Sequence, residues 1–228
     1  MFLVNIVSLE VIDVSSRVSR CQEVPIRSRT EKQLSTSRPR RGTPARTRER
    51  LVAAAAVLFN RVGFHGTDSN RIAREAGYST GTFYKHFKDK REIFLAAYET
   101  WVASEWKAVL AELSAGGAPD AMARRLVNLS VDFHTRWRGL RASLLELVFS
   151  DDHVRRFYRQ QRRHQLDVMA AIRANIKAPP RSREEDAIHL FTTERTFDAI
   201  AQGELGDLGL SRKVIIEAMI EKVISVLI

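Results

Sequence analysis

Apolar residues recur at intervals of three or four along most of the chain from residue 43 onward, which is the period of an amphipathic helix. Leu51, Ala55, Leu58 and Phe59 form the first such run. No segment alternates apolar and polar residues for long enough to make a strand. The pattern therefore predicts an all-α fold, and 228 residues, 44% of them hydrophobic, are enough to bury a substantial core.

Capping residues and glycines divide this pattern into helices. Thr67, Ser79 and Asp89 are expected to cap the second, third and fourth helices, and Gly116-Gly117 ends the fourth. The fourth helix would be roughly 37 Å long at 1.5 Å per residue, enough to join two domains. GELGDLG at residues 203–209 is expected to be a loop. The expected helices cover residues 44–62, 68–76, 80–87, 90–114, 119–137, 140–149, 152–176, 184–202 and 212–227.

The net charge of +10 is confined to the front of the chain. Residues 1–91 carry the whole excess of Lys and Arg over Asp and Glu, whereas residues 92–228 hold 19 of each sign. A neutral body with a basic end is typical of a protein that offers one end to a polyanion, and nucleic acid is the leading partner. Residues 15–45 are rich in Ser, Arg, Thr and Pro, so we expect residues 1–42 to be a disordered basic extension.

Two of the expected short helices meet at Gly77. Small Ala73 precedes this glycine by four residues, and Ile72 and Phe83 are placed to form a shared core. A tight helix–turn–helix needs a glycine where the chain reverses and small residues where backbones approach. Its second helix would face outward, shaped to enter a DNA major groove. The outward residues that could hydrogen-bond phosphates or base edges are Thr80, Thr82, Tyr84, Lys85 and His86.

The pattern GF..T....IA.EAG.S.GTFY.HF.DK..IF, residues 63–94, resembles the N-terminal domain of the TetR family of transcriptional regulators. The resemblance is close over residues 46 to about 100; beyond them only the number, length and position of the helices agree. It implies a three-helix helix-turn-helix DNA-binding domain at residues 43–91. A long fourth helix would join that domain to a helical domain at residues 92–228, which binds a small ligand and dimerises through its last two helices.

The resemblance also implies which residues touch DNA, by their position in the motif. The expected contacts are Thr67, Ser69, Asn70, Thr80, Gly81, Thr82, Tyr84, Lys85, His86 and Lys90. Those expected at bases or the groove floor are Thr80, Gly81, Tyr84 and Lys85. Phosphate contacts are expected from Thr82, Tyr84 and His86, with Lys90 holding the backbone at the start of the fourth helix.

The sequence departs from the family pattern at two places. Asp68 is acidic where the family often has Thr or Ser, so we interpret it as a helix cap that faces away from phosphates. The arginine-rich segment from Arg38 to Arg50 is longer than the family needs, which favours a flexible arm that reaches the minor groove.

The C-terminal domain supplies candidates for a ligand pocket and a dimer interface. Aromatic residues that could line an apolar pocket, or simply pack the core, are Trp101, Trp106, Phe133, Trp137, Phe149, Phe157 and Tyr158. The last helix is apolar nearly all round, and a second copy of the chain is the easiest cover for it. The dimer candidates are Phe191, Phe197, Ile215, Met219, Ile220, Val223 and Leu227.

Other classes of function find little support. The chain has no Gly-x-Ser-x-Gly elbow, no His-Glu-x-x-His and no phosphate-binding glycine loop before a lysine, so we do not expect an enzyme or a cofactor. The only cysteine is Cys21, and His86 has no second ligand at helical spacing, so no metal site is expected. The alternative is a non-specific basic helical protein bound to DNA or to an anionic membrane through the apolar residues 1–14, which leaves the glycine-turn motif unexplained.

The sequence thus predicts a cytoplasmic, ligand-responsive homodimeric repressor that binds a palindromic operator. A small-molecule effector in the C-terminal domain would shift the long fourth helix and so change the spacing of the two recognition helices.

Overall fold

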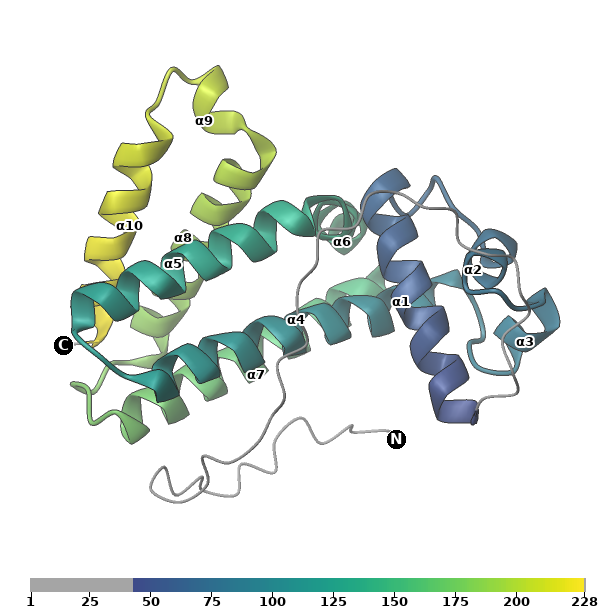
Figure 1. Cartoon of the computed structure of the whole chain (residues 1–228), viewed down its shortest axis with the longest axis horizontal. Coiled ribbons are helices and arrows are strands. Elements are labelled where there is room, and N and C mark those ends of the chain that lie inside the picture. The colour runs from purple at the N-terminus through teal and green to yellow at the C-terminus, as the bar shows by residue number, and fades with distance from the viewer. Residues whose placement is uncertain (1–42, 228) are drawn as a thin grey trace.

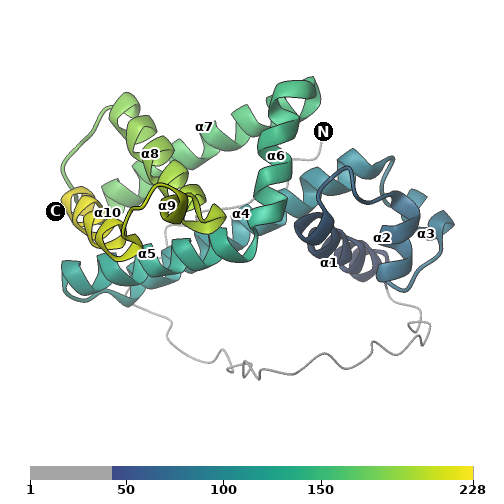
Figure 2. The same ribbon diagram turned by 90° about the horizontal axis from the view of Figure 1, so that it is seen from above.

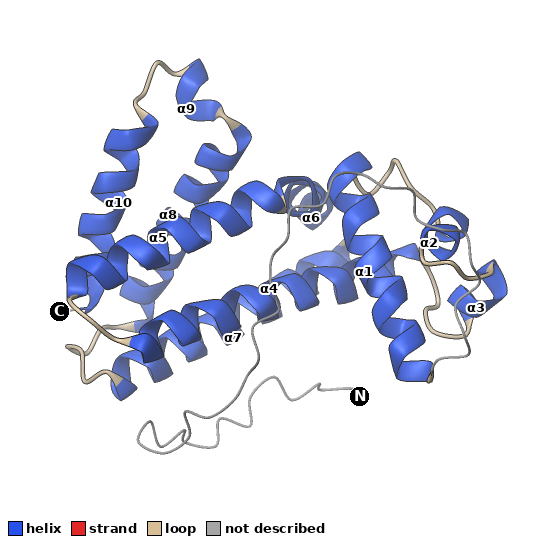
Figure 3. Cartoon of the chain, in the orientation of Figure 1, coloured by secondary structure: helices blue, strands red, loops and turns tan. Residues whose placement is uncertain are grey.

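The computed structural model describes residues 43–227, without the side chain of Leu227 (Figure 1). The expected disordered extension, residues 1–42, lies outside this range. The expectation of a flexible arm from Arg38 to Arg50 is corrected from residue 43 onward, because Thr43 caps α1 and Arg46, Arg48 and Arg50 belong to that helix. Within it every regular element is a helix, as the helical period predicts, and no strand occurs in the described part of the chain (Figure 3). The helices are α1 Pro44–Val62, α2 Ser69–Glu75, α3 Thr80–Tyr84, α4 Lys90–Ala115, α5 Pro119–Arg136, α6 Arg138–Ser150, α7 Asp152–Asn175, α8 Arg183–Gln202, α9 Glu204–Asp207 and α10 Arg212–Leu227.

Three local expectations are corrected. Asp68, not Thr67, caps α2, since its carboxylate accepts the Arg71 N–H at 2.9 Å; the interpretation of Asp68 as a helix cap is thereby confirmed. The third helix stops at Tyr84 rather than at residue 87, although the next N–H groups still bond back to Phe83. The expected loop at residues 203–209 contains the single-turn helix α9. In each case the local hydrogen bonds decide the boundary.

The first four helices and α6 share one hydrophobic core. Its fully buried members include Phe59, Phe83 and Phe94 from the N-terminal helices and Leu140 and Leu144 from α6. Helix α1 packs against both α4 and α6. The unit formed by α1–α3 therefore lies at one end of the molecule and rests on α4 and α6 (Figures 1 and 2).

A second core lies at the other end of the molecule. Helix α5 packs against both α8 and α10, and the buried side chains between them include Val127, Phe197 and Ile220. Figure 2 shows α8, α9 and α10 gathered beside α5, far from α3. No helix among residues 43–227 is both long and apolar enough to cross a membrane.

This second core takes up one side of the apolar last helix. Three of the dimer candidates, Phe197, Met219 and Ile220, are at most 6% exposed because they face α5 inside a single chain. Ile215 and Val223 pack partly against the same core, and Leu227 lies outside the described side chains. Phe191 is 51% exposed, and Ile188 and Val214 are also more than half exposed.

Candidate nucleic-acid interface and ligand cavity

The helix-turn-helix is held by a small core beneath α2 and α3. Ile72 and Phe83 are completely buried, and Ala73 is almost so. The chain reverses at Gly77, whose φ of 78° lies in the left-handed region that favours glycine. The Tyr78 N–H then donates to the Ala73 carbonyl at 2.8 Å, which closes the turn. The short core and the closed turn fix the angle at which α3 leaves the surface.

Polar side chains along α2 and α3 also hold one another. Ser79 caps α3: its hydroxyl accepts the Thr82 N–H at 3.3 Å and lies 3.1 Å from the Thr82 hydroxyl. Thr80 donates to Asn70 Oδ1 at 2.8 Å, a link from α3 back to α2. These bonds orient α3 before any partner arrives.

Most of the expected DNA contacts lie on one accessible face. Tyr84 is 57% exposed. Asn70, Gly81 and Lys85 are exposed as well, and Ser69, Thr80, Thr82 and His86 are half-buried. The face carries hydroxyl, amide, imidazole and ammonium groups together, which are the groups that hydrogen-bond phosphates and base edges.

Two expected contacts are not available in this structure: Thr67 is buried, and Lys90 is bound to backbone carbonyls. Thr67 is only 5% exposed, and its buried hydroxyl has no hydrogen-bond partner within residues 43–227. The Lys90 ammonium donates to the Phe64 and Thr67 carbonyls at 2.9 and 3.1 Å and lies 4.1 Å from the centre of the Phe64 ring. Burial lowers the pKa of Lys90, partly opposed by the charge of Asp68. Lys90 thus fastens the loop between α1 and α2.

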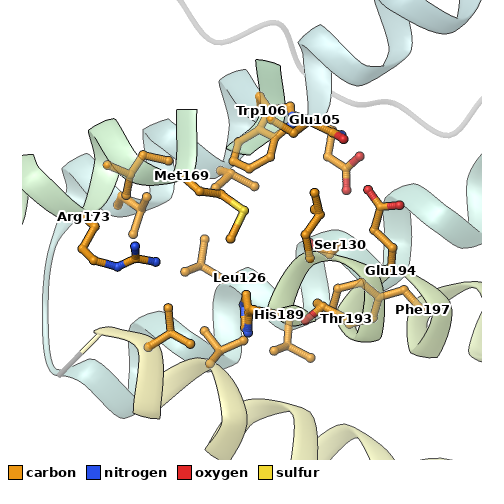
Figure 4. A pocket seen from close by; sticks show the side chains of 18 of the residues that line it. Glu105, Trp106, Leu126, Ser130, Met169, Arg173, His189, Thr193, Glu194 and Phe197 are labelled. Carbon is orange, nitrogen blue, oxygen red and sulfur yellow. The ribbon is translucent and has the colours of Figure 1, made fainter. Parts of the chain in front are cut away.

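A cavity of about 180 Å³ lies in the C-terminal half of the molecule (Figure 4). Helices α4, α5, α7, α8 and α10 all contribute to its wall, so the cavity lies among these five helices. Most of the lining is apolar, with Trp106, Leu126, Met169, Leu190, Phe197 and Val223 among the residues that line it. Such a cavity, with a few polar groups, is the usual form of a small-molecule site.

One end of this cavity is strongly charged. Figure 4 shows the Glu105 and Glu194 carboxylates there, with Arg173 at the far side. Burial alone would raise the pKa of Glu194, but the charges of Arg141 and Arg162 outweigh it and hold that pKa at about 2. The pKa of Glu105 is instead raised by burial to about 7, although the charge of His134 acts in the opposite direction. Two carboxylates at the same end therefore have very different acidities.

The charged end is tied to α6 through Arg141. The guanidinium donates to Glu194 Oε2 at 2.7 Å, to Asp198 Oδ2 at 3.2 Å and to the Tyr98 hydroxyl at 2.7 Å. Because Arg141 belongs to the helix that packs on α1, the cavity and the helix-turn-helix unit share a rigid connection.

The aromatic pocket candidates are distributed differently from the expectation. Trp106 lines the cavity. Phe149 is 82% exposed. The other candidates belong to the N-terminal core or pack against it: Trp101, Phe133, Trp137, Phe157 and Tyr158.

Sequence reasoning missed the charged groups of the cavity. His134 is not among the residues that the sequence singles out, yet its Nδ1 lies 2.9 Å from Asp198 Oδ1 and it lines the cavity. A signal was present, since Glu194 and Asp198 are four residues apart on a helix face that also carries buried Leu190 and Phe197. Charged residues inside an apolar stripe are costly unless they are paired.

Comparisons with known proteins agree with this geometry. Residues 51–97 match the family model described as bacterial regulatory proteins, tetR family. An uncharacterized HTH-type transcriptional regulator, YerO of Bacillus subtilis, is 40% identical over 55 residues, which are 24% of this chain and 19% of that protein. The match thus spans about a fifth of that relative's length.

Solved structures extend the likeness of the fold to most of the chain. A protein from Rhodococcus sp. assigned to the TetR-family transcriptional regulators has a TM-score of 0.66 at 16% identity, over 81% of this chain and all of that one. The regulator FadR of Bacillus subtilis, in complex with stearoyl-CoA, has a TM-score of 0.57 at 16% identity, over 78% of this chain and 97% of that one. Residues 51–97 thus match the tetR family of bacterial regulatory proteins, and the chain around them has the fold of these solved structures.

Proposed function

We propose that this protein is a homodimeric, ligand-responsive repressor that recognises a specific DNA sequence. The single observation that carries the proposal is the exposed polar surface of α3 and its C-cap, with Tyr84 and Lys85 exposed, on a helix-turn-helix of fixed geometry. The polar side chains of this five-residue helix suit the edges of base pairs.

The cavity supports the ligand response. FadR of Bacillus subtilis, a relative in fold, was crystallised with stearoyl-CoA, so a fold of this kind accommodates a ligand. In this chain Arg141 links the cavity to α6, and α6 packs on α1 of the helix-turn-helix unit. A ligand that displaces Glu194 would therefore act on α6, and through it on the orientation of α3. By linkage, a ligand that weakens DNA binding must itself be weakened by DNA to the same degree.

The exposed apolar residues support dimerisation. Ile188 and Phe191 on α8 and Val214 on α10 are each more than half exposed. The Lys222 ammonium of α10 donates to the Thr192 hydroxyl of α8, so the faces of these helices adjoin. A second copy would cover them, and its two-fold axis would set two half-sites about one helical turn, or a multiple of it, apart.

Selection of bound sequences from a random DNA pool tests this proposal, followed by titration of the selected DNA at several salt concentrations. We expect a palindrome whose affinity falls steeply with salt. Lys85→Ala should weaken binding and flatten the salt dependence, whereas Lys107→Ala, an exposed lysine on α4, should change neither. Binding without sequence preference would refute the proposal and favour a non-specific basic protein.

A further inference from the structure

At the acidic end of the cavity the carboxylates outnumber the guanidinium groups by one. Its charged members, apart from His134, come from α4, α6, α7 and α8 and are Glu105, Arg141, Arg162, Glu194 and Asp198. Both guanidinium groups are already committed: Arg141 to Glu194 and Asp198, and Arg162 to Glu194. Neither reaches Glu105.

Glu105 is the carboxylate that this network leaves without a cation of fixed charge. Its side chain is 16% exposed, and the facing group is His134, whose Nε2 lies 3.8 Å from Oε1. No donor in residues 43–227 makes a hydrogen bond to it. A buried carboxyl in this position either holds a proton or needs a cation, since an isolated buried charge is costly.

A second polar group in the wall is also unsatisfied. The Thr193 hydroxyl is buried, and the described residues offer it no hydrogen-bond partner. Native proteins seldom leave such a group unpaired. Thr193 lines the same cavity as Glu105, while the remaining wall is mainly apolar, with Trp106, Met169 and Phe197 as large members.

We propose that the cavity binds an amphipathic organic ammonium ion. The cationic head would meet Glu105 and supply the missing positive charge. The apolar body would lie among Trp106, Met169 and Phe197. A carboxylate or phosphate head would face Glu105 and Glu194 without a free guanidinium to receive it, so an anionic ligand is disfavoured at this end. The inference rests on the proposed function in taking this cavity as the effector site.

Calorimetric titration of the full chain with octylammonium, octanoate and octanol tests the head group, because the three share one apolar body. We expect octylammonium to bind most tightly and octanoate least. Glu105→Gln should weaken octylammonium binding about tenfold or more, the effect that an opposite charge at this distance has on a titrating group. Glu99→Gln, on the same helix but outside the cavity, should leave it unchanged.

Proton release gives an independent readout. At pH 7 Glu105 is partly protonated, so a bound ammonium ion should displace its proton, and titrations in buffers of different ionisation enthalpy measure that release. The other ionisable groups that face Glu105 are His134 on α5, Arg141 on α6, and Glu194 and Asp198 on α8. The variant Glu105→Gln abolishes only the part of the proton release that comes from Glu105. We expect most of the release to vanish in this variant.

Two results would overturn the inference: octanoate binding as tightly as octylammonium, or no binding of octylammonium to the wild-type chain. Neither bears on sequence-specific DNA binding, which the selection experiment decides separately. Conversely, octylammonium binding through Glu105 in a chain that selects no DNA sequence would leave the site standing and refute the proposed function.

Discussion

Asn60 in α1 accepts a hydrogen bond from the backbone N–H of Gly139 in α6, at 3.0 Å and across 79 positions of sequence. The same amide oxygen accepts from Leu140 N–H at 3.2 Å, and the amide nitrogen donates to the Arg136 carbonyl at 2.8 Å. Trp137, the residue at the N-cap of α6, makes no capping bond with its side chain. One side chain of the DNA-binding unit therefore caps the end of α5 and the start of α6 together.

Gly139 makes this contact possible. A β-carbon at this position would lie 2.0 Å from the Asn60 carbonyl oxygen, closer than any side chain allows. Phe64 N–H adds a bond to the Ser143 hydroxyl at 3.0 Å one turn further along. The junction between α1 and α6 thus combines side-chain-to-backbone hydrogen bonds with a close approach of the two backbones, which makes it stiff.

Replacing Asn60 should therefore destabilise the whole N-terminal core. For Asn60→Ala we expect a loss of roughly 1–3 kcal/mol in the free energy of unfolding, since three hydrogen bonds disappear and two helix-end N–H groups are left open. Asn60→Asp keeps the acceptor and should lose less. Urea denaturation measures both, with Asn128→Ala on exposed α5 surface as the control. Equal stability of Asn60→Ala and wild type would show that water caps α6 just as well.

The sequence predicts much of the fold because its local signals are strong. Asp89 caps α4 with its side chain 2.8 Å from the Glu92 N–H, as the spacing indicates, and Gly116 ends the helix. In the reciprocal bond Glu92 accepts from Lys88 rather than from Asp89, a detail that spacing cannot resolve. Periodicity likewise identifies Ile72 and Phe83 as core.

Of the two parts of the candidate site, only the DNA-binding face could be predicted from the sequence. The polar face of α3 follows from a short local motif, so its residues could be named in advance. The cavity depends on how α4, α5, α7, α8 and α10 pack, and the charged pair Arg141 and Glu194 meets across 53 positions without a local sequence pattern that predicts the contact. The side of α10 that faces α5 is likewise a tertiary outcome, which is why Met219 and Ile220 are interior rather than free for a partner.

Glu105 should make stability fall with rising pH. Its folded-state pKa of about 7 lies above the ordinary 4.5, so the folded protein holds a proton that the unfolded chain releases in this interval. The corresponding loss between pH 4.5 and 7 is roughly 3 kcal/mol. His189, whose pKa is lowered by burial to about 4, acts in the opposite sense between pH 4 and 6.5. We therefore expect the difference in unfolding free energy between Glu105→Gln and wild type to grow with pH, whereas a constant difference would contradict the raised pKa.

Substitutions of Lys90 and Tyr84 should affect different properties, the first the stability of the fold and the second the affinity for DNA. Lys90→Met removes two charged hydrogen bonds to the Phe64 and Thr67 carbonyls, and we expect it to lower the free energy of unfolding by roughly 1.5–3 kcal/mol. Tyr84→Ala removes a 57% exposed side chain and should change stability by about 0.5 kcal/mol or less while weakening binding to the selected DNA. Thermal unfolding and fluorescence anisotropy with labelled DNA measure the two effects. Full DNA affinity in Tyr84→Ala would show that α3 does not face the groove.

A charge on the exposed face of α8 should dissociate the dimer without unfolding the chain. Phe191→Glu places a carboxylate on a residue that is 51% exposed in one chain, and Ile188→Glu does so at 63%. In a dimer each carboxylate would be buried against its copy, where desolvation opposes association. Sedimentation equilibrium should show a shift toward monomer for both variants, whereas Ala142→Glu on exposed α6 surface should leave the association unchanged. DNA affinity should fall along with association, because a single helix-turn-helix holds only one half-site. A dimer that survives both substitutions would place the interface elsewhere on the chain.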